Sequence, residues 1–305
     1  MANIKELRGR IKSVTNIAKI TKAMEMVASM KLRKVQNRAL SHGPYTRTLY
    51  GIMEHLARHV GQDGGRPLFQ AREVKTIGVL LVTSDRGLCG AYNANVTAQV
   101  TRLARQLEAD GKGVRLKFYV IGRKGYTWLG RRGYEVVRFY AEPALEQLDF
   151  KMARIASDDL VAAFLAGEVD RVLVMSTAFR TASRFEPTTV PFLPLSSLTP
   201  EHDTSFAASG HGDGQEGKAG LNYLLEPDVD SMFDAIVPKY LQTVVFDSML
   251  ESLASEMASR RMAMKGATDA ASRMGKELRK KYNRARQESI TKELLDIVGG
   301  ASAVS

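Results

Sequence analysis

Apolar and small residues recur every three or four positions along the first 60 residues. The members of this series are Ile4, Leu7, Ile11, Val14, Ala18 and Thr21 and, after a break at Glu25, Ala28, Leu32, Val35 and Ala39. Alternating spacings of three and four are the heptad seam of a coiled coil. The pattern predicts one long helix from about Asn3 to about His59, with Gly43-Pro44 as a candidate kink and Gly61–Pro67 as its end.

The pattern changes after residue 70 to short apolar runs that alternate with helical periodicity. Val74–Thr83 is a continuous apolar run, which is typical of a strand buried on both faces. Further strands are predicted at 114–122, 135–140, 171–177 and 189–195, and helices from about 91 to 110, at 124–132 and at 143–167. This alternation indicates a largely parallel α/β sheet of the Rossmann type.

The last 80 residues return to a helical pattern. Glu226-Pro227-Asp228 carries helix-start signals, and Gly299-Gly300 is expected to cap the helix after about Val298. Pro238 lies within this pattern and is a candidate weak point in the continuity of the helix. Residues 196–220, rich in Gly, Ser and acidic residues, bury too little apolar surface to fold and are predicted to be a mobile loop.

A helix of about 70 residues needs an apolar partner along its length, and the other long helix of the chain is the first one. If both meet the α/β domain at the same end, they run antiparallel. The predicted fold class is therefore α/β, with a long antiparallel two-helix coiled coil and a central Rossmann-like domain. The expected domains are residues 1–60 (first helix), 70–225 (α/β domain with the loop 196–220) and 226–305 (last helix).

The net charge of +11 is concentrated at the two ends of the chain. Residues 1–60 hold 12 Lys and Arg against 3 Asp and Glu, and residues 260–286 hold 10 against 2, whereas residues 61–227 hold 20 against 19. Strongly basic ends indicate an acidic partner.

Few side chains suggest chemistry. Ser84–Gly90 lies between a strand and a helix, where nucleotide folds bind phosphate, but it is neither a P-loop nor G-x-G-x-x-G, so a structural turn is favoured. His55 and His59 have a metal-capable spacing without a third ligand nearby, which favours a solvated helix face. Cys89 is the only cysteine, which excludes an internal disulfide, and it is expected to be a small buried thiol.

Several longer motifs carry a resemblance to a known family. They are Ile20–Ala28 in the first helix, Ser84–Gly90 in the middle, and Glu251–Glu256, Met262–Asp269, Tyr282–Gln287 and Ile290–Ala301 in the last helix. Together, in this order, they resemble the gamma subunit of F-type ATP synthases over nearly the whole chain.

The resemblance implies the central rotor shaft of that enzyme. Such a chain is non-catalytic, has no cofactor or metal, and couples proton flow through a membrane ring to ATP synthesis or hydrolysis at the alpha/beta hexamer. The implied partners are the alpha and beta subunits, the epsilon subunit and the ring of c subunits, with no nucleic acid and no direct membrane insertion. The implied location is peripheral, on the cytoplasmic face of a bacterial cell membrane.

The resemblance also implies two sets of contact residues. Contacts to the alpha/beta ring are expected at Lys22, Met24, Arg261, Arg286, Gln287 and Thr291. Contacts of the foot with the membrane ring and epsilon are expected at Tyr223, Glu226 and Asp228.

The helix lengths predict an overhang. The last helix is longer than the first, so its final residues, near Arg286 to Val298, are expected to lack a partner in the chain while Ile290, Leu294 and Leu295 continue the apolar pattern. An apolar tip exposed to water favours association, so we expect a socket, which the resemblance identifies as the apolar sleeve of the alpha/beta ring.

Two alternatives remain at the level of sequence. The basic ends are compatible with a nucleic-acid-binding coiled coil, although they carry few aromatic residues and no binding motif. The other alternative is a nucleotide-binding enzyme that uses Ser84–Gly90 as its binding loop, although the sequence lacks a phosphate-binding motif and a candidate acid/base pair.

Overall fold

The computed structural model describes residues 4–60, 66–111, 113–195 and 228–304. The chain divides into two compact units: residues 1–29 with 260–305, and residues 30–259. We call these the two-helix unit and the α/β unit and describe each by itself. The predicted loop 196–220, with Tyr223 and Glu226 after it, lies outside the described residues.

The two longest helices contribute residues to both units. They are α1, Ile4–Val60, and α6, Val229–Val304. The remaining elements, all in the α/β unit, are β1 (Thr76–Val82), α2 (Tyr92–Ala109), β2 (Arg115–Ile121), α3 (Arg123–Gly130), β3 (Glu135–Tyr140), the 3₁₀ helix η1 (Leu145–Gln147), α4 (Phe150–Leu165), β4 (Arg171–Phe179) and β5 (Phe185–Leu193).

The five strands form one sheet in the order β3-β2-β1-β4-β5. β1 is parallel to both β2 and β4, and β2 is parallel to β3. β5 pairs antiparallel with β4, directly after the turn at 180–184. Every residue of β1 is buried, as its continuous apolar run predicts. The expected parallel-rich α/β sheet is confirmed.

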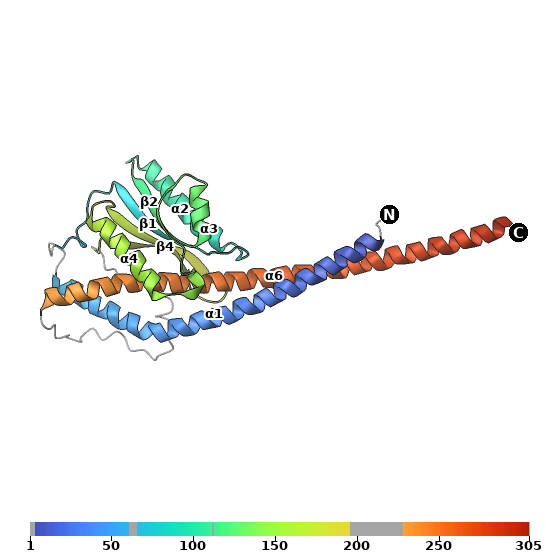
Figure 1. The fold of residues 1–305 in the computed structure, drawn as a ribbon, viewed down its shortest axis with the longest axis horizontal. Helices are drawn as coiled ribbons and strands as arrows, with labels where there is room; N and C mark the ends of the chain where they lie inside the picture. Colours follow the sequence, from blue (N-terminus) through green and yellow to red (C-terminus); the bar gives the residue numbers. More distant parts are fainter. Residues whose placement is uncertain (1–3, 61–65, 112, 196–227, 305) are drawn as a thin grey trace. The chain divides into compact units, whose positions relative to one another are not determined.

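The side chains of the sheet alternate between two cores. Ile77, Val79 and Leu81 of β1 face a core with α2 and α3, whereas Leu80 and Val82 face a larger core. That larger core contains α4 together with residues 32–56 of α1 and 233–258 of α6. Figure 1 shows α2 and α3 on one face of the sheet and α4 on the other.

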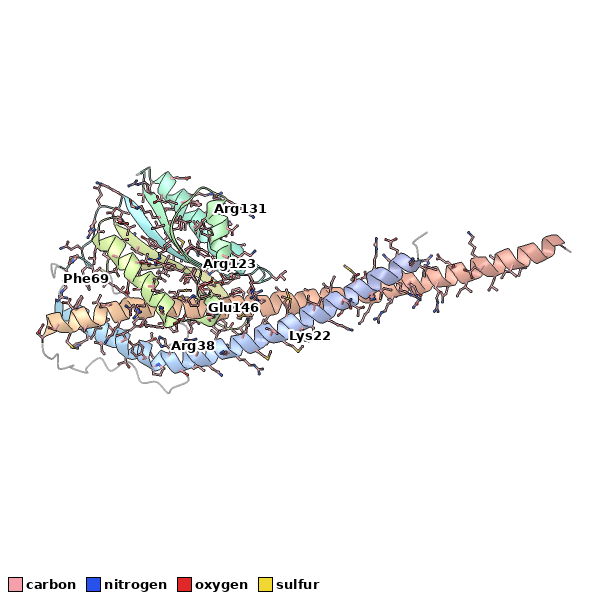
Figure 2. All side chains as sticks on the ribbon, in the orientation of Figure 1. Lys22, Arg38, Phe69, Arg123, Arg131 and Glu146 are labelled. Atoms are coloured by element: carbon pink, nitrogen blue, oxygen red, sulfur yellow. The ribbon has the colours of Figure 1, made fainter. Side chains whose placement is uncertain are left out.

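In the α/β unit, α1 and α6 lie antiparallel. His42 packs on Phe246 with ring centroids 4.9 Å apart, and Tyr50 packs on Tyr240 with centroids 5.2 Å apart. A higher residue number on α1 is therefore paired with a lower one on α6. Lys31 of α1 forms an ion pair with Glu146 of η1, and Figure 2 labels Glu146. The predicted antiparallel arrangement holds in this unit.

Two helices were predicted with the wrong boundaries. The helix expected at 143–167 is η1 followed by α4, because Leu148 takes a left-handed conformation with φ of 53° and Asp149 caps α4 by accepting a hydrogen bond from Lys151 N at 2.9 Å. Gly299-Gly300 does not end α6, which continues to Val304. Glycine permits a helix end without requiring one, and the residues that follow, Ala301-Ser302-Ala303, allow the helix to continue.

The prolines within the long helices do not end them. Pro44 lies inside α1 and Pro238 inside α6. A proline removes one backbone hydrogen bond and costs about 3 kcal/mol in an exposed helix. Around Pro238 the helix is anchored by Phe233, Val237 and Leu241, each at most 3% exposed, so burial offsets the lost bond.

Within the described residues, no helix is long and apolar enough to cross a membrane. The same part of the chain holds no group of three or more His, Cys, Asp or Glu side chains arranged to bind a metal ion.

Candidate functional site

The two-helix unit is an antiparallel pair with a fixed register. Arg8 Nη2 donates to Tyr282 Oη at 3.2 Å, and the hydroxyls of Thr21 and Thr268 lie 2.8 Å apart. Between them, a Cβ placed on Gly275 would contact Val14 at 3.8 Å. As the position on α1 rises from 8 through 14 to 21, its partner on α6 falls from 282 through 275 to 268. This register places Ile4, where α1 begins, opposite about residue 286.

Three of the expected ring-contact residues lie at one level of this unit. Lys22 is exposed and forms an ion pair with Glu25 at 3.0 Å, and Met24 and Arg261 are half-buried (Figure 2 labels Lys22). The register places Arg261 opposite Ala28, which is only 1% exposed. The three side chains therefore surround a closely packed stretch of the pair.

The other three lie at a second level. Arg286, Gln287 and Thr291 are exposed on α6, beyond the residues that face α1. Arg286 is 25 positions after Arg261, or about 37 Å along a helix that rises 1.5 Å per residue. The register thus places Lys22, Met24 and Arg261 within about 9 Å of one another along the helix axis and separates them from Arg286, Gln287 and Thr291.

The end of α6 is an exposed apolar tip, as the helix lengths predict. Its large apolar side chains are between 48% and 68% exposed: Ile290, Leu294, Leu295, Ile297 and Val298. Among the residues that the structure describes, no part of α1 lies opposite them in the register, because α1 begins opposite about residue 286. The overhang near Arg286 to Val298 is confirmed, and α6 itself extends it to Val304.

In the α/β unit, a row of buried serines fixes α6 to the sheet. Thr177 N, near the end of β4, donates to Ser252 Oγ at 3.1 Å, and Ser255 Oγ donates to Thr177 O at 3.4 Å. Ser259 Oγ donates to Cys89 O, in the turn after β1, at 2.6 Å. We call Ser252, Ser255 and Ser259 the serine row.

The serine row lies at a position with a known meaning in α/β sheets. Strand order reverses between β1 and β4, and in open α/β sheets ligands bind outside the carboxyl ends of the strands at such a point. Here the residues at those ends, Cys89 and Thr177, bind α6 of the same chain. The segment that a ligand would contact in a nucleotide-binding fold serves as an attachment for the helix.

The turn 84–90 is held by its own side chains. Ser84 Oγ donates to Arg86 O at 2.8 Å, and the two Asp85 oxygens accept from Arg123 N at 3.1 Å and Leu145 N at 3.3 Å. Cys89 is a buried thiol that forms no disulfide, as expected. These bonds support the structural interpretation of the turn and not a phosphate loop.

A carboxyl group is buried where α1 and α6 pack in the α/β unit. Tyr50 Oη donates to Asp247 Oδ2 at 3.3 Å, and His42 Nε2 lies 3.6 Å from Asp247 Oδ1. Burial, followed by the nearby Glu251 carboxylate, raises the pKa of Asp247 to about 8. Burial and then Arg38 lower the pKa of His42. At neutral pH this contact is therefore largely uncharged.

Of the expected foot residues, Asp228 is the one that the structure describes. It is exposed, and its carboxylate caps α6 by accepting from Ser231 N at 2.8 Å and Ser231 Oγ at 2.7 Å. The helix-start signal at this position is confirmed.

The sequence analysis did not identify the serine row. Its spacing of three and four positions matches one face of a helix and was a usable signal, but small polar residues in a helix do not indicate what they face. The sequence analysis also missed that segment 111–134 is basic, because it counted charges over the whole of residues 61–227, which are nearly neutral together.

Comparison with known proteins gives consistent results along the whole chain. The family model described as ATP synthase matches residues 3–304. The ATP synthase gamma chain of Chloroherpeton thalassium is 40% identical, covering 100% of this chain and 99% of the relative. That of Ralstonia nicotianae is 39% identical, covering 100% of both.

Solved structures share the fold. A chain from the cryo-EM structure of the Euglena gracilis mitochondrial ATP synthase, OSCP/F1/c-ring, has a TM-score of 0.63 at 19% identity, covering 99% of this chain and 94% of that one. One from the Tetrahymena thermophila mitochondrial ATP synthase central stalk and c-ring has a TM-score of 0.55 at 21% identity, covering 81% and 99%.

Proposed function

The chain belongs to the family of ATP synthase gamma chains, and from this we propose that it is the central rotor shaft of an F-type ATP synthase. In this role it is a non-catalytic subunit. It couples proton flow through the membrane ring to ATP synthesis or hydrolysis at the alpha/beta hexamer. The observation that carries the proposal beyond family membership is the rigid attachment of α6 to the sheet.

A rotor must transmit torque without slipping between its parts. A purely apolar contact is non-directional and tolerates sliding, whereas hydrogen bonds fix a register. The serine row provides three such bonds in buried surroundings, between α6 and the ends of β1 and β4. Turning the α/β unit therefore turns α6 with it.

The two levels of polar side chains suit contact with a ring that has three catalytic sites. Lys22, Met24 and Arg261 form one level, and Arg286, Gln287 and Thr291 form the other. The first level is formed by both helices and the second by α6 alone, and the two helices are unequal, so each of three equivalent subunits meets a different surface. Differential contact energy then shifts each site between states that it already has.

The apolar tip supports a socket in the partner. Large apolar side chains from Ile290 to Val298 are about half exposed or more. In water such a surface promotes association, whereas in an apolar sleeve formed by the alpha and beta subunits it is covered. Apolar walls suit a bearing because no hydrogen bond has to break at each step.

The foot contacts remain part of the proposal. We place Tyr223, Glu226 and Asp228 near the c ring and the epsilon subunit, with the complex peripheral on the cytoplasmic face of the bacterial membrane. The domains 1–60, 70–225 and 226–305 then correspond to the helix that runs toward the foot, the foot, and the helix that returns from it. A cysteine introduced at Tyr223 should crosslink to a ring or epsilon subunit, and crosslinks to alpha or beta alone would contradict this placement.

The function is tested by ATP-driven proton pumping in membranes that contain the assembled complex. Exposed ion pairs contribute only about 0–1 kcal/mol each, so alanine at Lys22, Arg261 or Arg286 singly should reduce pumping in part, and the triple variant much more. Met24→Lys adds a charge in a half-buried position and should impair pumping more than Met24→Ala. Full pumping by the triple variant in a complex of normal yield would refute the coupling role.

The nucleic-acid-binding alternative is not favoured, because the match to gamma chains covers the whole chain, basic ends included. Co-purification separates the two: the tagged chain should bring down ATPase subunits and no nucleic acid.

A further inference from the structure

A groove of about 520 Å³ lies between α2 and α3, on the face of the sheet opposite α4. From α2 it is lined by small side chains at helical spacing, from Ala94 to Thr101. From α3 and the turn after it, Lys124, Trp128, Arg131 and Arg132 line the other wall. The volume falls within the range of small-molecule sites, roughly 300–1,000 Å³. The rotor function uses none of these residues.

The groove carries positive charge and no negative charge. Three cations line it, and no carboxylate is among the residues of its wall. In the part of the chain that the structure describes, Lys124, Arg131 and Arg132 have no carboxylate within ion-pair distance. The surrounding segment 111–134 holds seven Lys and Arg and no Asp or Glu. A concave surface lined by one sign of charge raises the local concentration of the opposite ion.

The cations are spaced along the groove and do not meet at one point. Lys124 and Arg131 are seven positions apart on one face of α3, which is two turns, or about 10 Å. Figure 2 labels Arg131 near one end of α3 and Arg123, next to Lys124, near the other. An anion that satisfies both must therefore carry charge over several ångströms.

Trp128 and the threonines of α2 limit which chemical class of ligand the groove can bind. The Arg132 guanidinium lies 4.0 Å from the centroid of the Trp128 ring, and Tyr134 stacks on the same ring with the centroids 6.1 Å apart, so the indole already has a cation and a ring as partners. On α2, Thr97 Oγ1 and Thr101 Oγ1 donate to backbone carbonyls of their own helix. The groove thus offers cations and methyl groups, and lacks a row of free donors to bind a peptide backbone.

We propose that this groove binds a phosphate-bearing anion whose charge extends over two or more negative groups. Arginine guanidinium groups match phosphate oxygens in pairs, and lysine adds a point charge. The ligand is either a free compound with a phosphate chain or the headgroup of a phospholipid that carries two phosphates, which present the same chemistry to Lys124 and Arg131.

The test uses the full chain, two phosphate probes, and an oligoglutamate peptide with the same charge as tripolyphosphate as the comparison anion. Tripolyphosphate is titrated by calorimetry, and vesicles containing cardiolipin, whose headgroup carries two phosphates, are tested by co-sedimentation, each at low and at high salt. The groove variant is Lys124→Gln with Arg131→Gln. The matched control is Lys151→Gln with Arg154→Gln, which removes the same charge from exposed positions of α4, on the other face of the sheet. All four side chains are exposed, and thermal unfolding verifies that both variants fold.

We expect the groove variant to weaken binding of one probe by about tenfold or more, and the control to leave it within about twofold, with binding reduced at high salt. Loss for tripolyphosphate identifies a free phosphate compound, and loss for vesicles identifies a headgroup. The proposal is overturned if neither probe binds, or if both variants weaken binding equally. It is also overturned if an oligoglutamate peptide of equal charge binds the groove more tightly than tripolyphosphate. None of these outcomes bears on the rotor function.

Discussion

Ser259 illustrates how one side chain connects two distant segments. Its hydroxyl donates to Cys89 O, 170 positions earlier, at 2.6 Å. The same carbonyl also accepts from Tyr92 N at 3.3 Å, so removing the hydroxyl does not leave the oxygen without a partner. The bond is therefore expected to contribute near the average for a buried hydrogen bond, about 1 kcal/mol.

Ser259→Ala should lower the free energy of unfolding by about 1 kcal/mol, measured by urea denaturation of the full chain. The control is Ser272→Ala, at an exposed position of the same helix, which should change it by less than about 0.5 kcal/mol. Equal changes in the two variants would show that the bond to Cys89 contributes nothing.

Asp247 gives a pH dependence whose sign follows from its environment. Its pKa is raised to about 8 in the folded chain, compared with about 3.9 when unfolded. Between these values the folded state binds the proton and the unfolded state does not. The stability that this group contributes is therefore present below about pH 4 and is lost as the pH rises toward 8. The groups facing it are Glu251 from α6 and Tyr50, Thr46 and His42 from α1.

Asp247→Asn should flatten this dependence. The amide has the same shape and remains neutral, so the variant should be more stable than the natural chain by more than about 1 kcal/mol near pH 8, and similar to it near pH 4. Unfolding free energies at the two pH values provide the measurement, with the exposed Asp269→Asn as control. Parallel pH profiles for the natural chain and Asp247→Asn would contradict the prediction.

At the scale of elements, the turn between β2 and α3 depends on one glycine. Gly122 has φ of 97°, and a Cβ at this position would lie 2.1 Å from the carbonyl oxygen of Thr83. That residue is part of the junction between β1 and the turn 84–90, since Thr83 N donates to Ile121 O at 2.8 Å. A side chain would push the two strand ends apart.

Gly122→Ala should therefore destabilise the chain by about 2–4 kcal/mol in thermal or urea unfolding, from backbone strain and the clash together. Gly130→Ala is the control, because nothing lies within 4 Å of its added Cβ and α3 ends there. It should be neutral or slightly stabilising. A small effect of Gly122→Ala would mean that the turn adapts without cost.

Element boundaries show which local signals prevail. The apolar run of β1 was sufficient to predict a buried strand. The segment 143–167 was predicted as one helix because its periodicity is continuous, but the cap at Asp149 and the left-handed Leu148 divide it. A capping residue after an unfavourable backbone conformation outweighs apolar spacing, since it satisfies helix donors that would otherwise be unpaired.

At the scale of the whole molecule, the exposed tip leads to a prediction for assembly. Truncation after Val298 removes only the last turns of α6 and should leave both assembly and pumping largely intact. Truncation before Ile290 also removes the exposed apolar side chains and should lower the yield of assembled complex before it lowers the pumping of each complex. The measurement compares complex yield with ATP-driven pumping in membranes for both truncations.

The shorter truncation decides the role of the tip. If it stops turnover while the complex still assembles, the tip takes part in coupling and is not simply a bearing. Lys292→Ala, at an exposed position between the two truncation points, serves as the control for altered charge.

The sequence by itself determined the two long helices, the parallel strands and the family. These features depend on local periodicity and on motifs of consecutive residues. The heptad seam predicted which face of α1 packs against a partner helix, and the difference in helix lengths predicted the overhang, whereas the pairing of individual residues of α1 and α6 came only from the structure. Such patterns need no knowledge of what packs against them, because each element must bury its own apolar face in any fold.

Only the tertiary structure decided what the polar residues do. The serine row has a function because α6 crosses the ends of β1 and β4, and Asp247 is neutral because α1 and Glu251 surround it. The α2–α3 groove is basic because the cations of α3 face small residues of α2. Each depends on segments far apart in the chain. The free energy of a polar group is set by its neighbours in space, and the order of residues alone does not specify them.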